Sequence, residues 1–334
     1  MKKRVTIGDV AEAAGVSKQT VSRAINDKGE INAETKRRVM EVVRELGYRP
    51  SRLARAMGSQ QTRMVGLIVP DITNLFFPEV ARGVQDAALE EDYTVLVVNT
   101  DESAEQETRM LELMSAQAVD GIISFTHHMD ESRLLAFADG YRPMLLINRE
   151  VEHPNIDLLL VDNGKGAELA VDHLIENGHR HIGMLTNVAL DPTDIARVHG
   201  YLAALTRHAL TDHLFGTQAS SDGGYRGTLA LLQNNPQISA LFCYNDMMAI
   251  GAMRACHELD KHVPEDVAIV GYDDIQLMEA FNPPVSSVYI DKYRIGRLAF
   301  KRLLNRIEQP DDKLTPIRLD PELHIRASSH YQHQ

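Results

Sequence analysis

The chain has 334 residues, of which 44% are hydrophobic and 25% charged, and its formal net charge is −12. This length predicts two or three domains of an ordinary globular protein, and the apolar runs fall short of the roughly 18 residues that span a bilayer. The first residues, MKKRVTIGDVAEAAG, lack the apolar core of a signal peptide, and Cys243 and Cys256 have no metal-ligand spacing. Together these features predict a protein of a reducing cytoplasm.

Residues 6–26, TIGDVAEAAGVSKQTVSRAIN, predict a helix-turn-helix. Thr6 can cap a first helix, Gly15 allows a sharp turn, and Ser17 can cap a second helix. An ordinary three-helix packing unit with a solvated polar face is the alternative interpretation.

The second of these helices has the residue types that read DNA bases. Val21 and Ile25 lie four residues apart and predict a buried face, while Lys18, Gln19 and Arg23 lie on other faces. Arg pairs bidentately with guanine and Gln with adenine, so this helix is suited to the major groove.

The charge distribution supports this interpretation. Residues 1–63 carry 14 Lys+Arg against 7 Asp+Glu, which leaves 21 basic and 40 acidic residues in the rest of the chain. A basic end on an acidic body predicts that only this end approaches phosphate.

A third helix is predicted between Asn32 and Gly47, which completes a helical unit over residues 1–49 before Pro50. Residues 50–62, PSRLARAMGSQQT, then predict a hinge helix and linker. A helix of about six residues is marginal in water, so we expect it to form only when DNA or a second subunit supports it. A passive tether is the alternative.

From residue 64 onward, short apolar runs alternate with segments of helical length. Continuous β-branched runs are typical of strands buried on both faces, and their alternation with helices is typical of parallel βαβ units. Nine such runs predict two similar open α/β sheets with a cleft between them. The runs lie at 64–70, 93–100, 120–125, 144–148, 158–162, 181–185, 240–245, 267–274 and 286–291.

Ligands of open α/β sheets bind outside the carboxyl ends of the strands. Here this rule selects residues 71–77, 99–101, 148–149, 187, 244–246 and 273–274. Amide and carboxylate groups there can bind hydroxyls, and aromatic rings can cover the apolar side of a sugar. We expect Asp246 mainly to cap the following helix and Asn245 mainly to contact ligand, although capping is open to both.

With these elements in view, the chain resembles the lactose-repressor (LacI/GalR) family of bacterial transcription regulators over essentially its whole length. The motifs, in family order, are DVAEAAGVSKQTVSRAIN, LGYRPSRLARAM, VGLIVPDITNLFFPEVARGV, VDGII, LLVDNGKGAELAVDHLIENGHRHIG, ALFCYNDMMAIGAM and VPEDVAIVGYDDI. The resemblance implies an all-α helix-turn-helix domain, a hinge helix, and a periplasmic-binding-protein-like α/β body of two Rossmann-like subdomains. The implied domains are 1–49, 50–62, 63–161 with about 292–320, and 162–291 with about 321–334.

Carried over by motif, the resemblance implies which residues contact DNA. Met57 stands where the family has a Leu that wedges into the minor groove, and Gly58 stands where a basic residue is common. The expected DNA-binding residues are Thr6, Ser17, Lys18, Gln19, Thr20, Ser22, Arg23, Asn26, Ala54 and Met57.

The resemblance also sharpens the expected ligand site. Three departures from the family pattern argue against copying a relative's specificity: Asn148 replaces a common Asp, Tyr244 a small residue, and Ile290 a common Gln. They favour an effector that is smaller or less hydroxylated than a typical hexose. The expected ligand-binding residues are Asn74, Phe76, Phe77, Asp101, Arg149, Arg197, Tyr244, Asn245 and Asp273.

The sequence thus predicts a homodimeric transcriptional repressor of sugar or related carbon-source genes, located with the nucleoid in the bacterial cytoplasm. Its predicted partners are a near-palindromic operator and a small effector, a sugar or sugar derivative, and no cofactor, metal, membrane or enzymatic activity is expected. The clusters His127–His128 and His179–His181 lack the company of a zinc site. The alternatives are a solute-binding protein of a transporter, an enzyme acting on sugars, and a general nucleoid protein.

Overall fold

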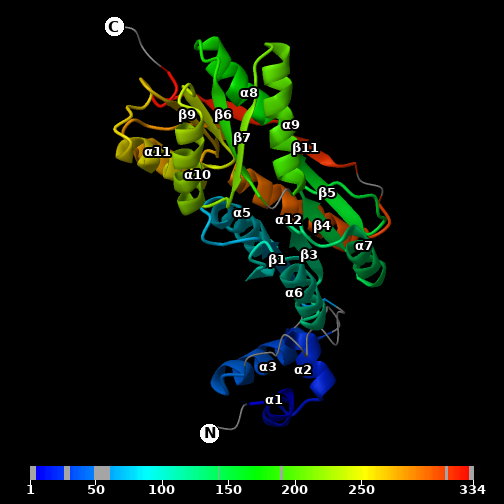
Figure 1. Ribbon diagram of the computed structural model, residues 1–334. Helices are drawn as coiled ribbons and strands as arrows, with labels where there is room; N and C mark the ends of the chain where they lie inside the picture. Colours follow the sequence, from blue (N-terminus) through cyan, green and yellow to red (C-terminus); the bar gives the residue numbers. More distant parts are fainter. Residues whose placement is uncertain are drawn as a thin grey trace. The chain divides into compact units, whose positions relative to one another are not determined.

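The computed structural model describes residues 5–25, 31–48, 61–141, 143–188, 191–312 and 315–330. The chain forms two compact units, residues 1–62 and 63–334 (Figure 1). The predicted hinge helix and the predicted DNA contacts Asn26, Ala54 and Met57 lie outside the described residues.

The described residues of the first unit form three helices: α1 (Ile7–Ala14), α2 (Lys18–Ile25) and α3 (Ala33–Glu45). One fully buried valine from each helix, Val10, Val21 and Val39, meets the others in a small core. The side chain of Asn32 caps α3 by accepting a hydrogen bond from the Glu34 N–H at 2.9 Å. The predicted helix-turn-helix with a third helix is therefore present.

The second unit contains two sheets, each of six strands in the described part of the chain. The first has the order β11-β5-β4-β3-β1-β2 and is parallel throughout. The second has the order β12-β10-β9-β8-β6-β7 and is parallel except for β12, which runs antiparallel to β10. The strands are β1 (Met64–Val69), β2 (Thr94–Asn99), β3 (Gly121–Ser124), β4 (Met144–Ile147), β5 (Ile156–Val161), β6 (Ile182–Asn187), β7 (His213–Thr217), β8 (Ala240–Cys243), β9 (Ala268–Asp273), β10 (Ser286–Tyr289), β11 (Ile317–Leu319) and β12 (Glu322–His324).

The central strands are the apolar runs of the sequence, and they are buried on both faces because helices cover both sides of each sheet. Every residue of β3, β4, β5, β6, β8 and β9 is buried. Cys243 in β8 and Cys256 are buried free thiols, and burial raises the pKa of both. The prediction of two open α/β sheets is confirmed.

Closely packed helix pairs flank the sheets, among them α5 with α12, α8 with α9, and α10 with α11 (Figure 1). The α5–α12 contact depends on glycine: a Cβ on Gly296 would lie 2.1 Å from the Val80 carbonyl oxygen. No helix among the described residues is long and apolar enough to cross a membrane. The helices are α5 (Phe76–Glu90), α6 (Ala104–Ala116), α7 (Glu131–Gly140), α8 (Asn163–Glu176), α9 (Pro192–Arg207), α10 (Ser221–Asn234), α11 (Asp246–Glu258) and α12 (Lys292–Glu308), with a 3-10 turn η1 (Gln276–Ala280).

The two sheets repeat one topology, in which the first strand of each half lies inside the sheet between the second and third. The strand order therefore reverses between β1 and β3 in the first sheet and between β6 and β8 in the second. Such reversal points open a crevice at the carboxyl ends of the strands, where α/β proteins bind ligands. The chain passes from one sheet to the other after β5, after β10, and between β11 and β12.

Candidate functional site

Helix α2 presents a polar surface. Its Val21 and Ala24 are buried against the other two helices, whereas Lys18, Gln19 and Arg23 are exposed. The helix carries no acidic residue, so its exposed face is electropositive. These are the side-chain types that contact base edges and phosphates in a major groove.

Local capping interactions define both ends of α1 and the start of α2. Gly15 adopts a φ of 63°, a left-handed conformation that ends α1 and favours glycine. The Ser17 hydroxyl accepts the Thr20 N–H at 3.1 Å. Thr6 forms a capping box with Asp9, whose carboxylate accepts the Thr6 N–H at 2.7 Å.

The other predicted DNA contacts in this unit differ in exposure. Thr6 and Ser17 are exposed, while Thr20 and Ser22 are half-buried. The stem of Lys18 lies over the start of α1, because a Cβ on Gly8 would be 3.3 Å from its Cε. Lys18 therefore leaves its helix along a supported path, with its ammonium group still available to solvent.

In the second unit, a cavity of about 60 Å³ lies beyond the carboxyl ends of strands from both sheets. It lies at the two points of strand-order reversal. Its lining includes residues that come after β1 and β3 in the chain in one half, and after β6 and β8 in the other. The lining residues are Pro70, Asn74, Phe76, Phe77, Glu102, Phe125, His127, His128, Asn148, Asp191, Thr193, Arg197, Ala219, Tyr244, Asn245 and Asp273.

The cavity brings together seven of the nine predicted ligand-binding residues: Asn74, Phe76, Phe77, Arg197, Tyr244, Asn245 and Asp273. Asp101 and Arg149 are outside its lining, which instead includes their neighbours Glu102 and Asn148. Asp101 is exposed on a turn with a φ of 52°, and Arg149 is buried with its guanidinium donating to the Thr126 carbonyl at 2.9 Å.

Three phenylalanines form an aromatic wall of the cavity. The Phe77 ring lies edge-to-face with both Phe76 and Phe125, at 5.2 Å between centroids in each case. Phe76 and Phe77 begin α5, and Phe125 follows β3, so two separate elements build this wall. Such a surface suits the apolar face of a ring-shaped ligand.

Arg197 in α9 is held from several sides. Its guanidinium donates to the Asn163 side-chain oxygen at 3.0 Å and to the Tyr244 carbonyl at 2.5 Å. It lies 3.4 Å from an Asp273 carboxylate oxygen and 3.5 Å above the Tyr272 ring centroid. Burial raises the pKa of Asp273 to about 6, although Arg197 and Lys292 act in the opposite direction.

The roles expected for Asn245 and Asp246 need correction. Asn245 is the residue that caps α11, because its side-chain oxygen accepts the Met248 N–H at 2.9 Å, and it also lines the cavity. Asp246 is the first helical residue and is 1% exposed. Its carboxylate accepts hydrogen bonds from the Ser287 hydroxyl at 2.6 Å and the Ile275 N–H at 2.7 Å. It ties α11 to the sheet.

The structure adds polar lining residues that the sequence rule missed, notably His127, Asp191 and Thr193. His127 Nδ1 lies 3.1 Å from an Asp191 carboxylate oxygen. The Thr193 hydroxyl is buried and has no hydrogen-bond partner among the described residues. Asp191 caps α9 with the pattern Asp-Pro-Thr-Asp, a capping box that the sequence does display.

In the described part of the chain, no group of three His, Cys, Asp or Glu side chains is arranged to hold a metal ion.

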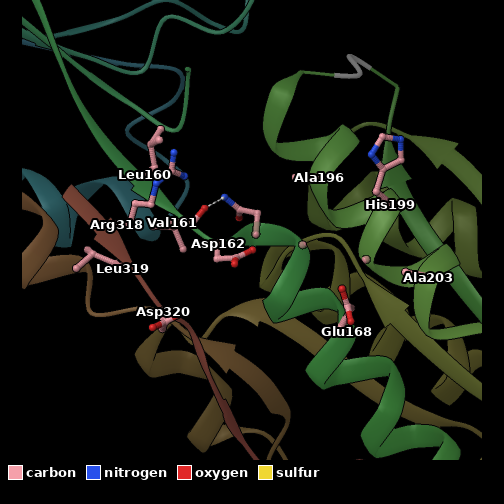
Figure 2. Close-up of a pocket in the computed structure, with 13 residues that line it drawn as sticks. Leu160, Val161, Asp162, Glu168, Ala196, His199, Ala203, Arg318, Leu319 and Asp320 are labelled. Atoms are coloured by element: carbon pink, nitrogen blue, oxygen red, sulfur yellow. Dashed lines mark hydrogen bonds between the residues drawn. The ribbon is translucent and has the colours of Figure 1, made fainter. Parts of the chain in front are cut away.

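A larger groove of about 500 Å³ lies beside the crossing after β5 (Figure 2). Figure 2 shows Asp162 at the start of α8, with Arg318 and Asp320 on one side and His199 of α9 on the other.

The charged groups of this groove are bound to other residues. Arg318 pairs with Glu150 at 2.8 Å, Asp320 with Lys165 at 2.8 Å, and Glu168 with Arg207 at 2.7 Å. The strands that line the groove, β5 and β11, lie at one edge of the first sheet and not at either strand-order reversal. The smaller cavity is therefore the better candidate for a ligand site.

Helix α2 and the cavity together define a class: DNA-binding regulators whose helix-turn-helix is joined to a periplasmic-binding-protein-like, ligand-binding body. Comparison with known families agrees. Residues 6–51 match "Bacterial regulatory proteins, lacI family", and residues 171–329 match "Periplasmic binding protein-like domain".

Relatives match along nearly the whole chain. The HTH-type transcriptional repressor PurR of Aliivibrio salmonicida is 33% identical over 97% of this chain and 99% of that protein. The ribose operon repressor of Halalkalibacterium halodurans is 35% identical over 91% of each chain. The chain therefore belongs to the lacI family of bacterial regulatory proteins, and the relatives are transcriptional repressors.

Solved structures give the same result. The lac repressor dimer bound to operator and the anti-inducer ONPF superposes with a TM-score of 0.89, at 27% identity, over 98% of this chain and 99% of that one. A LacI-family regulator from Enterococcus faecium with bound ribose superposes with a TM-score of 0.74, at 28% identity, over 80% of this chain and 98% of that one. The expected combination of a helix-turn-helix and a two-sheet body is thus confirmed.

Proposed function

We propose that this protein is a dimeric repressor of sugar or related carbon-source genes, and that an uncharged sugar bound in the cavity changes its affinity for an operator. The observation that carries the proposal is the cavity at both strand-order reversals, with an aromatic wall and polar groups from both halves. The repressor names of its relatives and the ribose-bound neighbour support it.

The charges of the cavity favour an uncharged effector. Arg197 is already paired with Asp273, and His127 with Asp191, so each of these two basic groups has a carboxylate partner. Exposed Glu102 adds a third carboxylate to the lining. A phosphate would meet this excess of negative charge, whereas sugar hydroxyls can bind carboxylate, amide and carbonyl groups without a change in charge.

We assign the effector contacts to the lining residues predicted from sequence, together with Asn148, Asp191 and Thr193. The Thr193 hydroxyl supports this assignment: it has no hydrogen-bond partner in the part of the chain that the structure describes, and a ligand hydroxyl would satisfy it. We further propose that the body consists of two subdomains, residues 63–161 with about 292–320 and residues 162–291 with about 321–334. Their relative angle would respond to the effector.

On the DNA side, we assign base contacts to Lys18, Gln19 and Arg23 and phosphate contacts to residues around them. A dimer would place one α2 in each half-site of a near-palindromic operator. The protein would act in the cytoplasm, with the nucleoid, and would have no catalytic activity of its own.

Thermal unfolding of the full chain tests the effector proposal. The panel pairs neutral sugars with charged counterparts: D-ribose with ribose 5-phosphate, and D-glucose with glucose 6-phosphate and gluconate. A neutral ligand at 100 times its Kd adds about 2.7 kcal/mol of stability, which gives a clear rise in Tm. Stabilisation by the charged member of each pair and not by the neutral one would contradict the proposal.

Selection of binding sites from random duplex DNA tests the repressor half of the proposal. We expect one near-palindromic sequence to be enriched, and its affinity to change when the stabilising sugar is added. Equal binding to all duplexes would instead indicate a general nucleoid protein.

A further inference from the structure

One hydrogen-bonded contact crosses the cavity. His127 follows β3 of the first sheet, and Asp191 caps α9 in the half that contains the second sheet. His127 Nδ1 lies 3.1 Å from Asp191 Oδ2, and the two side chains are 7% and 8% exposed. The contact therefore joins the two halves of the body in a place that is nearly closed to water.

The partners of His127 define its protonation state. Its Nε2 lies 2.9 Å from the Ile147 carbonyl oxygen, which can only accept, so Nε2 carries a hydrogen. Its Nδ1 faces a carboxylate whose other oxygen already accepts the Asp194 N–H at 2.8 Å. A ring with hydrogens on both nitrogens satisfies both acceptors, and that ring is an imidazolium cation.

The electrostatic surroundings also favour the charged form of His127. Burial lowers the pKa of His127, but the bond to Asp191 and the charge of that carboxylate outweigh burial and raise the pKa above its usual value. Burial raises the pKa of Asp191, but the bond to His127 and its positive charge bring it down to about 2. The two groups thus favour each other's charged forms.

The loop that carries His127 is fixed to its own half. The buried Glu107 carboxylate of α6 accepts the backbone N–H groups of His127 at 2.9 Å, His128 at 3.1 Å and Met129 at 2.6 Å. His127 therefore cannot readily follow Asp191 if the halves separate. Separation would break the contact and leave a buried imidazolium without its carboxylate.

Other charged and titratable groups surround the pair. Asp194 matters most for any pH measurement, because burial and the charge of Asp191 raise its pKa to about 7. The remaining groups on the packed elements are Glu107 of α6, Arg149 after β4, Arg197 of α9, and Glu102, His128, Tyr244 and Asp273 around the cavity.

We propose that His127 and Asp191 are positioning residues that latch the two halves of the cavity together while His127 carries its second proton. The latch holds the effector-contacting residues of both halves in one arrangement. This inference rests on the proposed function, because it concerns the regulation of the same cavity.

The sign of the pH dependence follows from linkage. A histidine whose pKa is raised in the folded state contributes its stabilisation fully below its unfolded pKa. The stabilisation is then lost as the pH rises through the folded value. The latch is therefore expected to hold in mildly acidic solution and to release in alkaline solution.

The test is the Tm of the full, ligand-free chain between pH 5.5 and 9 for wild type, His127→Gln and Asp191→Asn. Both variants should melt several degrees below wild type at pH 6, and the difference should shrink as the pH rises. The double variant should lose little more than either single variant, because both remove the same contact. Asp194 keeps the neighbouring charge of Asp191 in both wild type and His127→Gln, so its titration cancels in that comparison. Asp191→Asn removes this charge and therefore also lowers the pKa of Asp194.

His153→Gln is the matched control, because His153 pairs with Asp139 at 3.2 Å within the first half. The difference in Tm between His153→Gln and wild type should not shrink as the pH rises. If the His127→Gln difference is independent of pH, or if the two single losses are additive, the latch is overturned. Should His127→Gln fail to fold, Asp191→Asn carries the same comparison, since Asn can still cap α9.

A binding measurement with D-ribose keeps the two proposals apart. The Kd of wild type for D-ribose should rise from pH 6 to pH 8.5, because the latch is expected to release over this range. The Kd of Asp191→Asn for D-ribose should change less. Absence of ribose binding at both pH values would count against the proposed sugar class. The ligand-free Tm profile would still decide on the latch.

Discussion

Arg197 shows how one residue can serve both a site and a fold. It lines the cavity, yet its donors are engaged by Asn163, Tyr244 and Asp273, and aromatic rings flank its guanidinium. A lysine could supply the charge at this position but not the planar fork of donors or the stacking. The residue-level prediction is therefore about stability as well as ligand binding.

Arg197→Ala should lower the free energy of unfolding by about 3–5 kcal/mol. The Arg197 side chain is only 5% exposed, and its removal leaves the buried Asp273 carboxylate without its cationic partner. Arg207→Ala is the matched control in the same helix. The Arg207 side chain is 44% exposed and pairs with Glu168 and Asp172, so its loss should cost at most about 1 kcal/mol. Urea denaturation followed by circular dichroism measures both, and equal losses would refute the structural role of Arg197.

Arg23→Ala tests base readout by α2. Loss of a bidentate contact to a base should weaken binding to the selected operator by about 1–3 kcal/mol while leaving binding to random duplex nearly unchanged. Arg44→Ala, at the end of α3, removes the same charge from the same unit and should not change the preference between the two duplexes. Fluorescence anisotropy at fixed salt concentration compares them.

At the scale of elements, the sequence indicated the central strands because continuous apolar runs are what sheets covered on both faces require. It did not indicate β7, whose residues alternate between half-buried and exposed, or β11 and β12, which have three residues each. Pairing partners that lie far apart in the chain stabilise these edge strands, and a local pattern does not contain that information.

The candidate site was predicted to a similar extent. The rule of carboxyl strand ends found Tyr244, which directly follows β8, and Asn74, which lies in the loop between β1 and α5. It chose Asp101 where the lining has Glu102; both residues lie in a turn after β2, with left-handed φ values of 52° and 54°. It missed Asp191, which enters the cavity as the cap of α9 rather than at the end of a strand.

The α5–α12 pair gives an element-scale prediction. Gly296→Ala places a methyl group where only 2.1 Å separates it from the Val80 carbonyl, so the helices must move apart, at a cost of about 1–3 kcal/mol or more. Gly140→Ala near the end of α7 is the control, because no atom of the described residues lies within 4 Å of the added carbon. It should be neutral or stabilising by up to about 1 kcal/mol in urea denaturation. A neutral Gly296→Ala would mean that this helix contact is loose.

At the scale of the whole molecule, the proposed function makes DNA and effector binding reciprocal. If the effector changes operator affinity by a coupling free energy of about 1–3 kcal/mol, saturating operator must change effector affinity by the same factor. Calorimetric titration of the sugar with and without operator duplex measures this factor. If operator does not change the Kd for sugar, although sugar changes the Kd for operator, the two results violate linkage. One of the measurements would then report another process.

The triple passage of the chain between its two sheets has a mechanical consequence. Three backbone connections join the halves. We expect them to resist sliding and twisting more than bending, so that relative motion of the halves would be mainly a change in one angle. Molecules of quite different shape that fill the cavity would therefore drive the body along the same path. Under the proposed function, a new effector could therefore be acquired by changing the lining alone, with the same motion still passed to the DNA-binding unit.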